Sequence, residues 1–253
     1  MATKGGATRK AAPPDVVYPY RRTTDDEALS YSLRSLDKHA RGIYGRVWIV
    51  GDLPEWATGV EHIPHEHLRG RQDDIRAKWT LVAGHPEVSS VFLLMNDDMW
   101  LMRRVRRFEA FHMGPTSVYL DRLERDGDRY RTWRSHVRAT ADWMAEQGYP
   151  DPLVRQGHRP ALFDKAKVAE VLDAYPADRP LELLGTYDLT GAGGVGVRAG
   201  NAKIVTSEHF HAKTAPDVLA VQPWLSASDE AFSDGLIGGY IRASFPTPSR
   251  YER

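Results

Sequence analysis

Short apolar runs alternate along this chain with segments of helical periodicity. The first run, Asp15–Tyr20, has the composition of a β-strand. A pair with capping-box spacing, Thr24 and Glu27, precedes four apolar residues on one helical face and a closing glycine: Leu29, Leu33, Leu36, Ala40 and Gly42. This pattern predicts a strand followed by a helix.

Two further strand-like runs, at residues 46–50 and 88–95, are each followed by acidic residues. Asp52 comes just after the first run, and an Asn-Asp-Asp triplet at 96–98 follows the second. Strands that alternate with helices predict an α/β fold, with a mostly parallel sheet covered by helices on both faces. Ligands gather at the carboxyl ends of the strands in such sheets, so both acidic positions are expected at a binding edge.

Helical composition or periodicity predicts further helices over residues 72–83, 133–148, 165–174 and 226–243. The glycine-rich segment 190–200 is expected to form a loop or hairpin. Its G-x-G-x-x-G spacing is that of a dinucleotide-binding turn, but it lies late in the chain and runs into a strand-like segment instead of a helix. We therefore interpret it as a flexible connection.

Length and composition are those of one globular domain. The chain has 253 residues, of which 42% are apolar and 27% charged, and single α/β domains of roughly 250 residues are common. Residues 1–14 are small, basic and proline-ended, and we expect them to form a flexible tail. Residues 15–253 are expected to form a single catalytic domain.

The composition also excludes several chemistries. Cysteine is absent, which removes disulfides, thiolate zinc sites and cysteine nucleophiles. No apolar run has the length of a membrane span and the first residues lack the apolar core of a secretory signal, so a cytoplasmic protein with no membrane partner is expected. The 34 basic and 34 acidic residues leave no net charge, so any contact with a polyanion must be local.

Asp97 and Asp98 are the most distinctive chemical feature of the sequence. Adjacent carboxylates after a hydrophobic strand are costly to desolvate unless a cation offsets their charge. Mg²⁺ or Mn²⁺ held by one or two carboxylates can neutralise a nucleotide diphosphate before its bond to a sugar breaks. A turn or a helix N-cap is the simpler alternative for such a pair.

Several sequence blocks resemble, in their order along the chain, the central and flanking blocks of the Stealth family. They are DVVY at 15–18, the stretch 31–56, IPHEHL at 63–68, FLLMNDDM at 92–99, HRP at 158–160 and FPTPSRYE at 245–252. That family contains capsular polysaccharide phosphotransferases and the lysosomal-enzyme N-acetylglucosamine-1-phosphotransferase, and it is similar to GT-A-type glycosyltransferases. The resemblance implies a GT-A-like fold and a nucleotide-sugar donor, expected to be UDP-linked.

The resemblance also implies roles for individual residues. Asp97 and Asp98 would hold Mn²⁺ or Mg²⁺ at the catalytic centre, with Asp98 acting in catalysis as well. His158 matches the family's active-site histidine and would serve as general base or phosphate contact. The remaining donor-binding assignments are Asp15, Tyr18, Asp52 and Arg250.

The chain departs from the family pattern at three places. Pro19-Tyr20-Arg21-Arg22 stands where the family has a Trp-Val-Asp-Gly-like stretch, and residues 69–79 replace a Phe-Asn-Ser block. Arg179 is the candidate for an arginine expected after the His158 block. Transfer of a sugar and transfer of a sugar phosphate therefore both remain open.

An arginine-rich segment at 102–108 follows the acidic triplet. Its arginines, Arg103 among them, could bind donor phosphates or a polyanionic acceptor, or could form the solvated face of a helix. Basic and aromatic residues recur at 130–138. We therefore expect the acceptor hydroxyl on a glycan or on a hydroxymethylated base in DNA; the alternative is a non-catalytic nucleic-acid-binding module on the same fold.

Two groups of histidines are also candidates for metal binding. His62, His65 and His67 are crowded but lack the spacing of a zinc site, so we interpret them as part of a polar loop. His209 and His211 lie late in the chain, where a last metal ligand is often found in GT-A-type enzymes. His211 is taken as the third metal ligand, the alternative being a packed or solvated pair.

Overall fold

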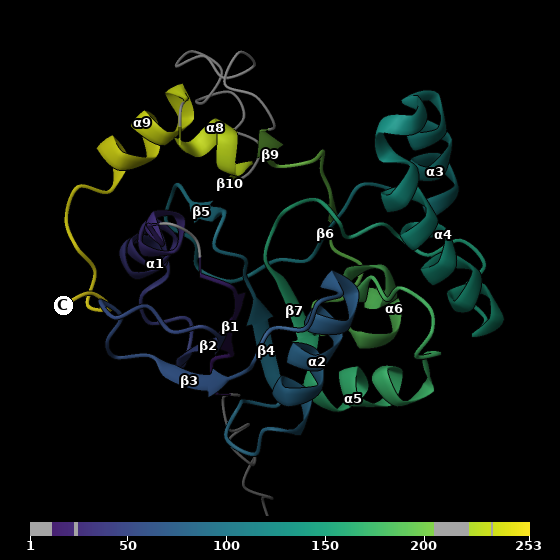
Figure 1. The fold of residues 1–253 in the computed structure, drawn as a ribbon, viewed down its shortest axis with the longest axis horizontal. Coiled ribbons are helices and arrows are strands. Elements are labelled where there is room, and N and C mark those ends of the chain that lie inside the picture. The colour runs from purple at the N-terminus through teal and green to yellow at the C-terminus, as the bar shows by residue number, and fades with distance from the viewer. Residues whose placement is uncertain (1–11, 23–24, 205–222, 234) are drawn as a thin grey trace, which may run out of the picture.

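A mostly parallel sheet forms the centre of the protein (Figure 1). The computed structural model describes residues 12–22, 25–204, 223–233 and 235–253. The sheet is five-stranded, in the order β3-β2-β1-β4-β7, and its last strand pairs antiparallel to β4. Its strands are β1 (Asp15–Tyr20), β2 (Val47–Gly51), β3 (Glu61–Pro64), β4 (Val91–Leu94) and β7 (Ala161–Asp164). The predicted strands are confirmed, and β3 and β7 are additions to them.

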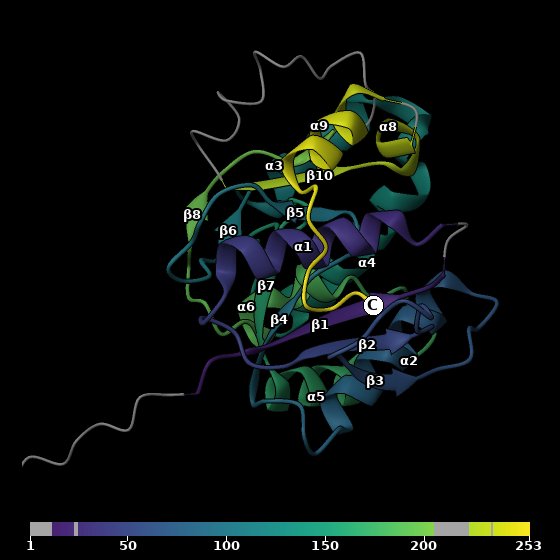
Figure 2. The same ribbon diagram turned by 90° about the vertical axis from the view of Figure 1, so that its left-hand side faces the viewer.

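Helices cover both faces of this sheet (Figure 2). Successive side chains of a strand point to opposite faces, and Val16 packs in the cluster that contains α1 (Glu27–Ala40) while Val17 packs in the other. The cluster that contains Val17 also contains residues of α2 (Arg71–Gly84) and α5 (Lys165–Ala174). The predicted α/β architecture with two covered faces is therefore confirmed.

The start of α1 differs from the capping-box prediction. The helix begins at Glu27, and its N-cap residue Asp26 has a left-handed backbone conformation with φ of 53°. The backbone N–H of Glu27 donates to the Asp25 carboxylate at 3.1 Å. Glu27 is thus the first residue of the helix rather than the third, and Thr24 lies outside the described residues.

A second, smaller sheet begins with the strand that follows the acidic triplet and packs against the carboxyl-terminal helices. Its sheet has the order β5-β10-β9, with β5 (Met99–Leu101), β9 (Lys203–Ile204) and β10 (Trp224–Ala227). Helices α8 (Asp229–Ser233) and α9 (Leu236–Ser244) pack on it, and the Trp100 ring stacks on Phe232 at 5.1 Å between centroids.

The single helix predicted over 226–243 is therefore wrong. Ser226 and Ala227 belong to β10 because they pair with β5 and β9, segments distant in sequence. Gly235 is extended, with φ of −114° and ψ of 173°, and it separates α8 from α9.

A helical hairpin projects beside the sheet (Figure 1). It consists of α3 (Thr116–Arg125) and α4 (Arg131–Glu146), joined by a 3₁₀ turn at Gly127–Tyr130. The turn at Leu183–Thr186 contacts α4 and continues into α6 (Tyr187–Thr190). None of the helices within the described ranges combines the length and apolar character needed to cross a membrane.

The glycine-rich segment is held by a specific strand pairing. Within it, β8 (Val197–Arg198) pairs parallel with β6 (Phe111–His112), which excludes the hairpin alternative at this pairing. Gly196 has φ of 81°, and a Cβ there would lie 2.3 Å from the Ala110 carbonyl oxygen. A glycine is required because the two backbones approach so closely.

The last residues of the chain cross α1 (Figure 2). Glu252 accepts two-pronged hydrogen bonds from the Arg34 guanidinium, at 3.0 Å and 2.6 Å. The Thr58 N–H donates to the Tyr251 carbonyl at 2.9 Å. The closing segment therefore fastens α1 to the connection between β2 and β3.

Candidate active site

The acidic triplet forms the turn between β4 and β5. The Met95 N–H continues the β1 ladder by donating to the Val17 carbonyl, and the Met99 N–H closes the turn on the Asn96 carbonyl. The carboxyl edge of the parallel sheet therefore presents Asp97 and Asp98, as the alternation of strands and helices predicted.

Among the described residues, only one of the two carboxylate oxygens of Asp98 has hydrogen-bond partners. Its Oδ2 atom accepts from Lys203 Nζ at 3.0 Å and from Ser226 Oγ at 3.2 Å. Its Oδ1 atom is buried and has no hydrogen-bond partner among the described residues. A buried carboxylate oxygen without a donor is costly, so this atom is a ready acceptor for a cation or a ligand.

Asp97 stands beside this group in a poorly hydrated position. Burial, followed by the charge of Asp98, raises the pKa of Asp97 to about 7. Asp229, which begins α8, raises the pKa of Asp97 further. Three carboxylates thus act on one another at this edge, which is the electrostatic situation that a bound cation relieves.

His158 lies close to this carboxylate cluster, in a strained loop. Its backbone is left-handed, with φ of 50°, an uncommon conformation for a residue that is not glycine. Burial and the neighbouring charge of Lys203 lower the pKa of His158 to about 4, against the opposing effect of Asp98. The imidazole is therefore neutral near pH 7 and has an unprotonated ring nitrogen, although its proton affinity is lower than that of an ordinary histidine.

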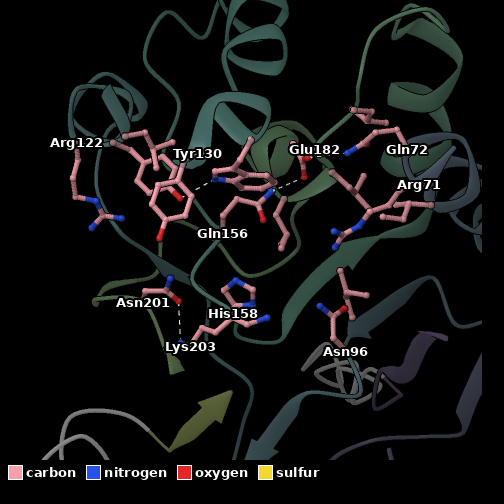
Figure 3. A pocket seen from close by; sticks show the side chains of 18 of the residues that line it. Arg71, Gln72, Asn96, Arg122, Tyr130, Gln156, His158, Glu182, Asn201 and Lys203 are labelled. Atoms are coloured by element: carbon pink, nitrogen blue, oxygen red, sulfur yellow. Dashed lines mark hydrogen bonds between the residues drawn. The ribbon is translucent and has the colours of Figure 1, made fainter. Parts of the chain in front are cut away.

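A cavity of about 720 Å³ lies beside these residues. Its walls come from the end of β4, the start of α2, the α3–α4 hairpin and residues 181–184. His158, Lys203 and Asn96 line it, and Figure 3 shows His158 next to Lys203 with Tyr130 and Glu182 across the cavity. The size lies within the range of roughly 300–1,000 Å³ that is usual for small-molecule sites.

Glu182 was not among the residues singled out from the sequence. Its side chain is 14% exposed, and its two oxygens accept from Gln72 Nε2 at 3.1 Å and Gln156 Nε2 at 3.4 Å. Burial raises the pKa of Glu182 to about 7, although both amides lower it. The one available sequence signal was a lone acid within the leucine-rich run 181–184, since apolar neighbours indicate burial.

Asp52 shares the sheet edge with the acidic pair but occupies a separate depression. Its Oδ2 atom accepts from the Arg22 N–H at 2.7 Å and contacts His67 Nε2 at 2.8 Å. Burial raises the pKa of Asp52, but these two hydrogen bonds outweigh it and leave the pKa below the ordinary value. Asp52 follows β2 and the acidic pair follows β4, and strand β1 lies between these two strands. Because neighbouring strands are about 4.8 Å apart, Asp52 and the acidic pair are separated along the edge by about two strand spacings.

The histidines at 62–67 are not all in a loop. His62 lies within β3, which corrects the polar-loop interpretation for that residue. His65 Nε2 contacts the Asp74 carboxylate at 3.0 Å, and His67 lies between Asp74 and Asp52. Hydrogen bonds to buried Asp74 and to partly exposed Asp52 therefore account for His65 and His67.

Two of the predicted donor residues lie within the core. Asp15 is at the amino end of β1, where its carboxylate accepts from Trp48 Nε1 at 2.9 Å and from the Ser89 N–H at 3.0 Å. The Tyr18 side chain is fully buried, with its hydroxyl 3.0 Å from Ser32 Oγ. Neither lines the cavity, and their roles in donor binding stay predictions.

Arg250 and Arg103 lie away from the cavity. The Arg250 guanidinium donates to the Tyr44 and Tyr251 hydroxyls at 3.0 Å and 2.7 Å. Arg103 is exposed in the connection between β5 and β6. This connection is not helical, which excludes the alternative of a solvated helical face. Neither arginine lines the cavity, and donor binding by them stays a prediction.

The third expected metal ligand, His211, lies outside the described residues. Within the described ranges, no group of three or more His, Asp or Glu side chains has the geometry to hold a metal ion. Any cation at Asp97 and Asp98 would therefore draw further ligands from a bound substrate, from water or from residues outside those ranges.

Comparison with protein-family models and with curated proteins gives no match for this chain. Interpretation of its function therefore depends on the acidic pair, His158 and the cavity beside them.

Proposed function

We propose that this protein is a transferase that uses a nucleotide sugar, expected to be UDP-linked, on a GT-A-like fold. The observation that carries the proposal is the Asp98 carboxylate at the carboxyl edge of the parallel sheet, with one buried oxygen lacking a partner among the described residues. Lys203, which donates a hydrogen bond to Asp98, lines the cavity, and so does Asn96, the first residue of the acidic triplet. A charged ligand in that cavity can thus reach the acidic edge.

The acidic pair fits a hard divalent cation such as Mn²⁺ or Mg²⁺. Asp98 Oδ1 is available as a ligand, and Asp97 brings a second carboxylate to the same turn. Such a cation keeps sites for phosphate oxygens when the protein provides only one or two carboxylates. Bound there, it would supply neutralisation of the leaving diphosphate.

The residues of this chain would then orient the acceptor and take its proton. For sugar transfer, the acceptor oxygen forms a bond to the anomeric carbon, the carbon–oxygen bond to the diphosphate breaks, and UDP leaves. For sugar-phosphate transfer, the acceptor oxygen attacks the β-phosphorus, the bond between the phosphates breaks, and UMP leaves. In both reactions His158 accepts the proton from the acceptor hydroxyl.

The test is nucleotide release from a panel of UDP-sugars with Mn²⁺, with and without acceptor. We expect release that stops in a chelator and returns with added Mn²⁺, and that falls at least 100-fold in Asp98→Asn. The matched control is Asp142→Asn, an exposed aspartate on α4, which should behave as the wild type. Absence of release with every donor, or release unaffected by both chelator and Asp98→Asn, would overturn the proposal.

The acceptor is a glycan or a hydroxymethylated base in DNA. The DNA alternative is supported by Arg103, Arg104 and Arg106, which are exposed and form no ion pair with any described residue. Contacts of this kind release counterions from DNA, so transfer should weaken steeply with salt. Replacing Arg104 and Arg106 with Gln should reduce that dependence, whereas transfer to a neutral glycan should not respond.

The alternative of a non-catalytic nucleic-acid-binding module is supported by the same exposed arginines. The nucleotide-release test separates the two functions, because a binding module should release no UDP or UMP in the presence of Mn²⁺.

A further inference from the structure

The cavity has an aromatic wall that the reaction at the acidic pair does not require. Tyr119 of α3, Trp133 of α4 and Tyr130 of the turn between these helices all line it. Trp133 Nε1 donates to the Tyr119 hydroxyl at 3.0 Å, which holds the two rings relative to each other. The Arg122 guanidinium lies 4.9 Å from the centre of the Tyr119 ring and also lines the cavity. This wall is suited to a flat, electron-delocalised ligand.

Beside this wall, the cavity presents hydrogen-bonding groups that are already partly engaged (Figure 3). Gln72 Nε2 contacts Glu182 Oε1 at 3.1 Å and His136 Nδ1 at 3.0 Å, so both of its N–H groups have partners. Gln72 Oε1 is buried and has no partner among the described residues. A ligand that donates one hydrogen bond would satisfy this oxygen.

Glu182 extends this hydrogen-bonding edge. Because burial raises the pKa of Glu182 to about 7, its carboxyl is partly protonated near neutrality and can donate as well as accept. Gln156, which is bonded to Glu182, also lines the cavity and adds an amide. These neighbouring amide and carboxyl groups offer both donors and acceptors, as the edge of a heterocycle requires.

Much of the remaining lining is apolar: Ile75, Leu94, Leu181, Leu183 and Leu184. A sugar ring laid against these apolar side chains would bury hydroxyl groups that find no partner on that surface. A heterocycle has polar atoms only around its edge and can lay its faces against such surfaces. The lining therefore favours a nucleobase over a glycan.

We propose that this cavity binds a nucleobase, stacked on Trp133 and the neighbouring tyrosines, with its edge hydrogen-bonded to Gln72, Gln156 and Glu182. The inference rests on the proposed function, because the base would belong either to the nucleotide of the donor or to the acceptor in DNA. Both sources share the same chemistry, and the experiment distinguishes them.

The experiment is calorimetric titration of the full chain with UMP, with ribose 5-phosphate, with a maltooligosaccharide and with a short single-stranded DNA containing 5-hydroxymethylcytosine. We expect UMP or the DNA to bind at least tenfold more tightly than ribose 5-phosphate and the oligosaccharide. Binding of UMP assigns the base to the donor, and binding of the DNA alone assigns it to the acceptor if that binding weakens in Trp133→Ala. Equal affinity for UMP and ribose 5-phosphate without DNA binding, or no binding of any probe, would overturn the proposal.

Two variants test the wall and the edge separately. Trp133→Ala should weaken binding of the base-containing probe about tenfold or more, because stacking on one aromatic side chain is worth about 1–3 kcal/mol. The control Tyr149→Ala removes an exposed tyrosine that does not line the cavity, and it should leave affinity unchanged. Thermal unfolding of each variant shows whether it is folded, and unchanged affinity in folded Trp133→Ala would contradict the stacking.

For the edge, methylation of the donating ring nitrogen of UMP at N3 should weaken binding to the wild type if UMP is the ligand. In Gln72→Met this penalty should largely disappear, a result that a merely structural role of Gln72 does not produce. If DNA is the ligand, N4-dimethylation of the modified cytosine replaces this probe. Discrimination equal in wild type and variant would overturn the edge assignment.

Failure of this inference can be told apart from failure of the proposed function. Metal-dependent nucleotide release that persists in Trp133→Ala, with no base-dependent binding, refutes the nucleobase site and leaves the transferase standing. Base-dependent binding without metal-dependent release refutes the transferase and leaves the nucleobase site.

Discussion

Replacing Glu182 with glutamine should change the way in which the stability of this protein depends on pH. The carboxyl is largely buried between two glutamine amides at the edge of the cavity. Burial raises the pKa of Glu182 from 4.5 to about 7 in the folded protein. In the variant, the side chain has nearly the same shape but carries no titratable proton, and Gln156 can turn its amide to accept from the new N–H group.

The sign of the effect follows from proton binding. Between pH 4.5 and 7 the folded protein holds the Glu182 proton more tightly than the unfolded chain does. The free energy of unfolding of the wild type therefore decreases as pH rises through this range, and this contribution stays constant above it. The rise of the Glu182 pKa from 4.5 to about 7 corresponds to about 3 kcal/mol, since a shift of one pKa unit is worth about 1.4 kcal/mol.

The assay is urea unfolding of wild type and Glu182→Gln at several pH values between 4.5 and 8. We expect the free energy of unfolding of the variant, relative to the wild type, to rise by about 3 kcal/mol across this range. The control is Glu170→Gln, an exposed glutamate on α5, whose difference from the wild type should stay nearly constant. A difference for Glu182→Gln that does not change with pH, or that falls as pH rises, would refute the reasoning.

Three further substitutions separate structural roles from catalytic ones. Asp15→Ala should lower the free energy of unfolding by about 3 kcal/mol in urea titrations because buried donors such as Trp48 Nε1 lose their acceptor; loss of donor hydrolysis at unchanged stability would instead support donor binding. Glu252→Ala should cost about 3 kcal/mol and expose the chain end to proteases, since Arg34 loses its partner; unchanged protease resistance would argue against that fastening. Lys203→Met should tighten Mn²⁺ binding roughly tenfold by calorimetry, because a nearby cation is removed; unchanged affinity would argue that the metal does not bind at Asp98.

The central part of the fold could be predicted from the sequence. Strands β1, β2 and β4 and helices α2 and α5 have apolar patterns or compositions that local spacing reveals. Their alternation also predicted the parallel sheet and the position of the acidic triplet at its carboxyl edge.

Prediction failed where pairing between distant segments overrides local preference. Ser226 and Ala227 have neighbours that favour a helix, yet they lie in β10 because Ser226 pairs with Met99 and Lys203. The 102–108 segment has residues that suit a helix, but the Val105 N–H bonds to the His39 carbonyl at the end of α1. Both contacts join residues far apart in sequence, which local periodicity does not encode.

The same division holds for the candidate site. The sequence by itself determined that two carboxylates follow a buried strand, because both the hydrophobic run and the acids are local features. Only the tertiary structure decided that Lys203 and Ser226 satisfy one oxygen of Asp98 and leave the other buried without a described partner. It also placed Glu182 between two amides from other segments. Burial and charge partners, which set the pKa and the ligand chemistry of these groups, come from side chains that meet only when the chain has folded.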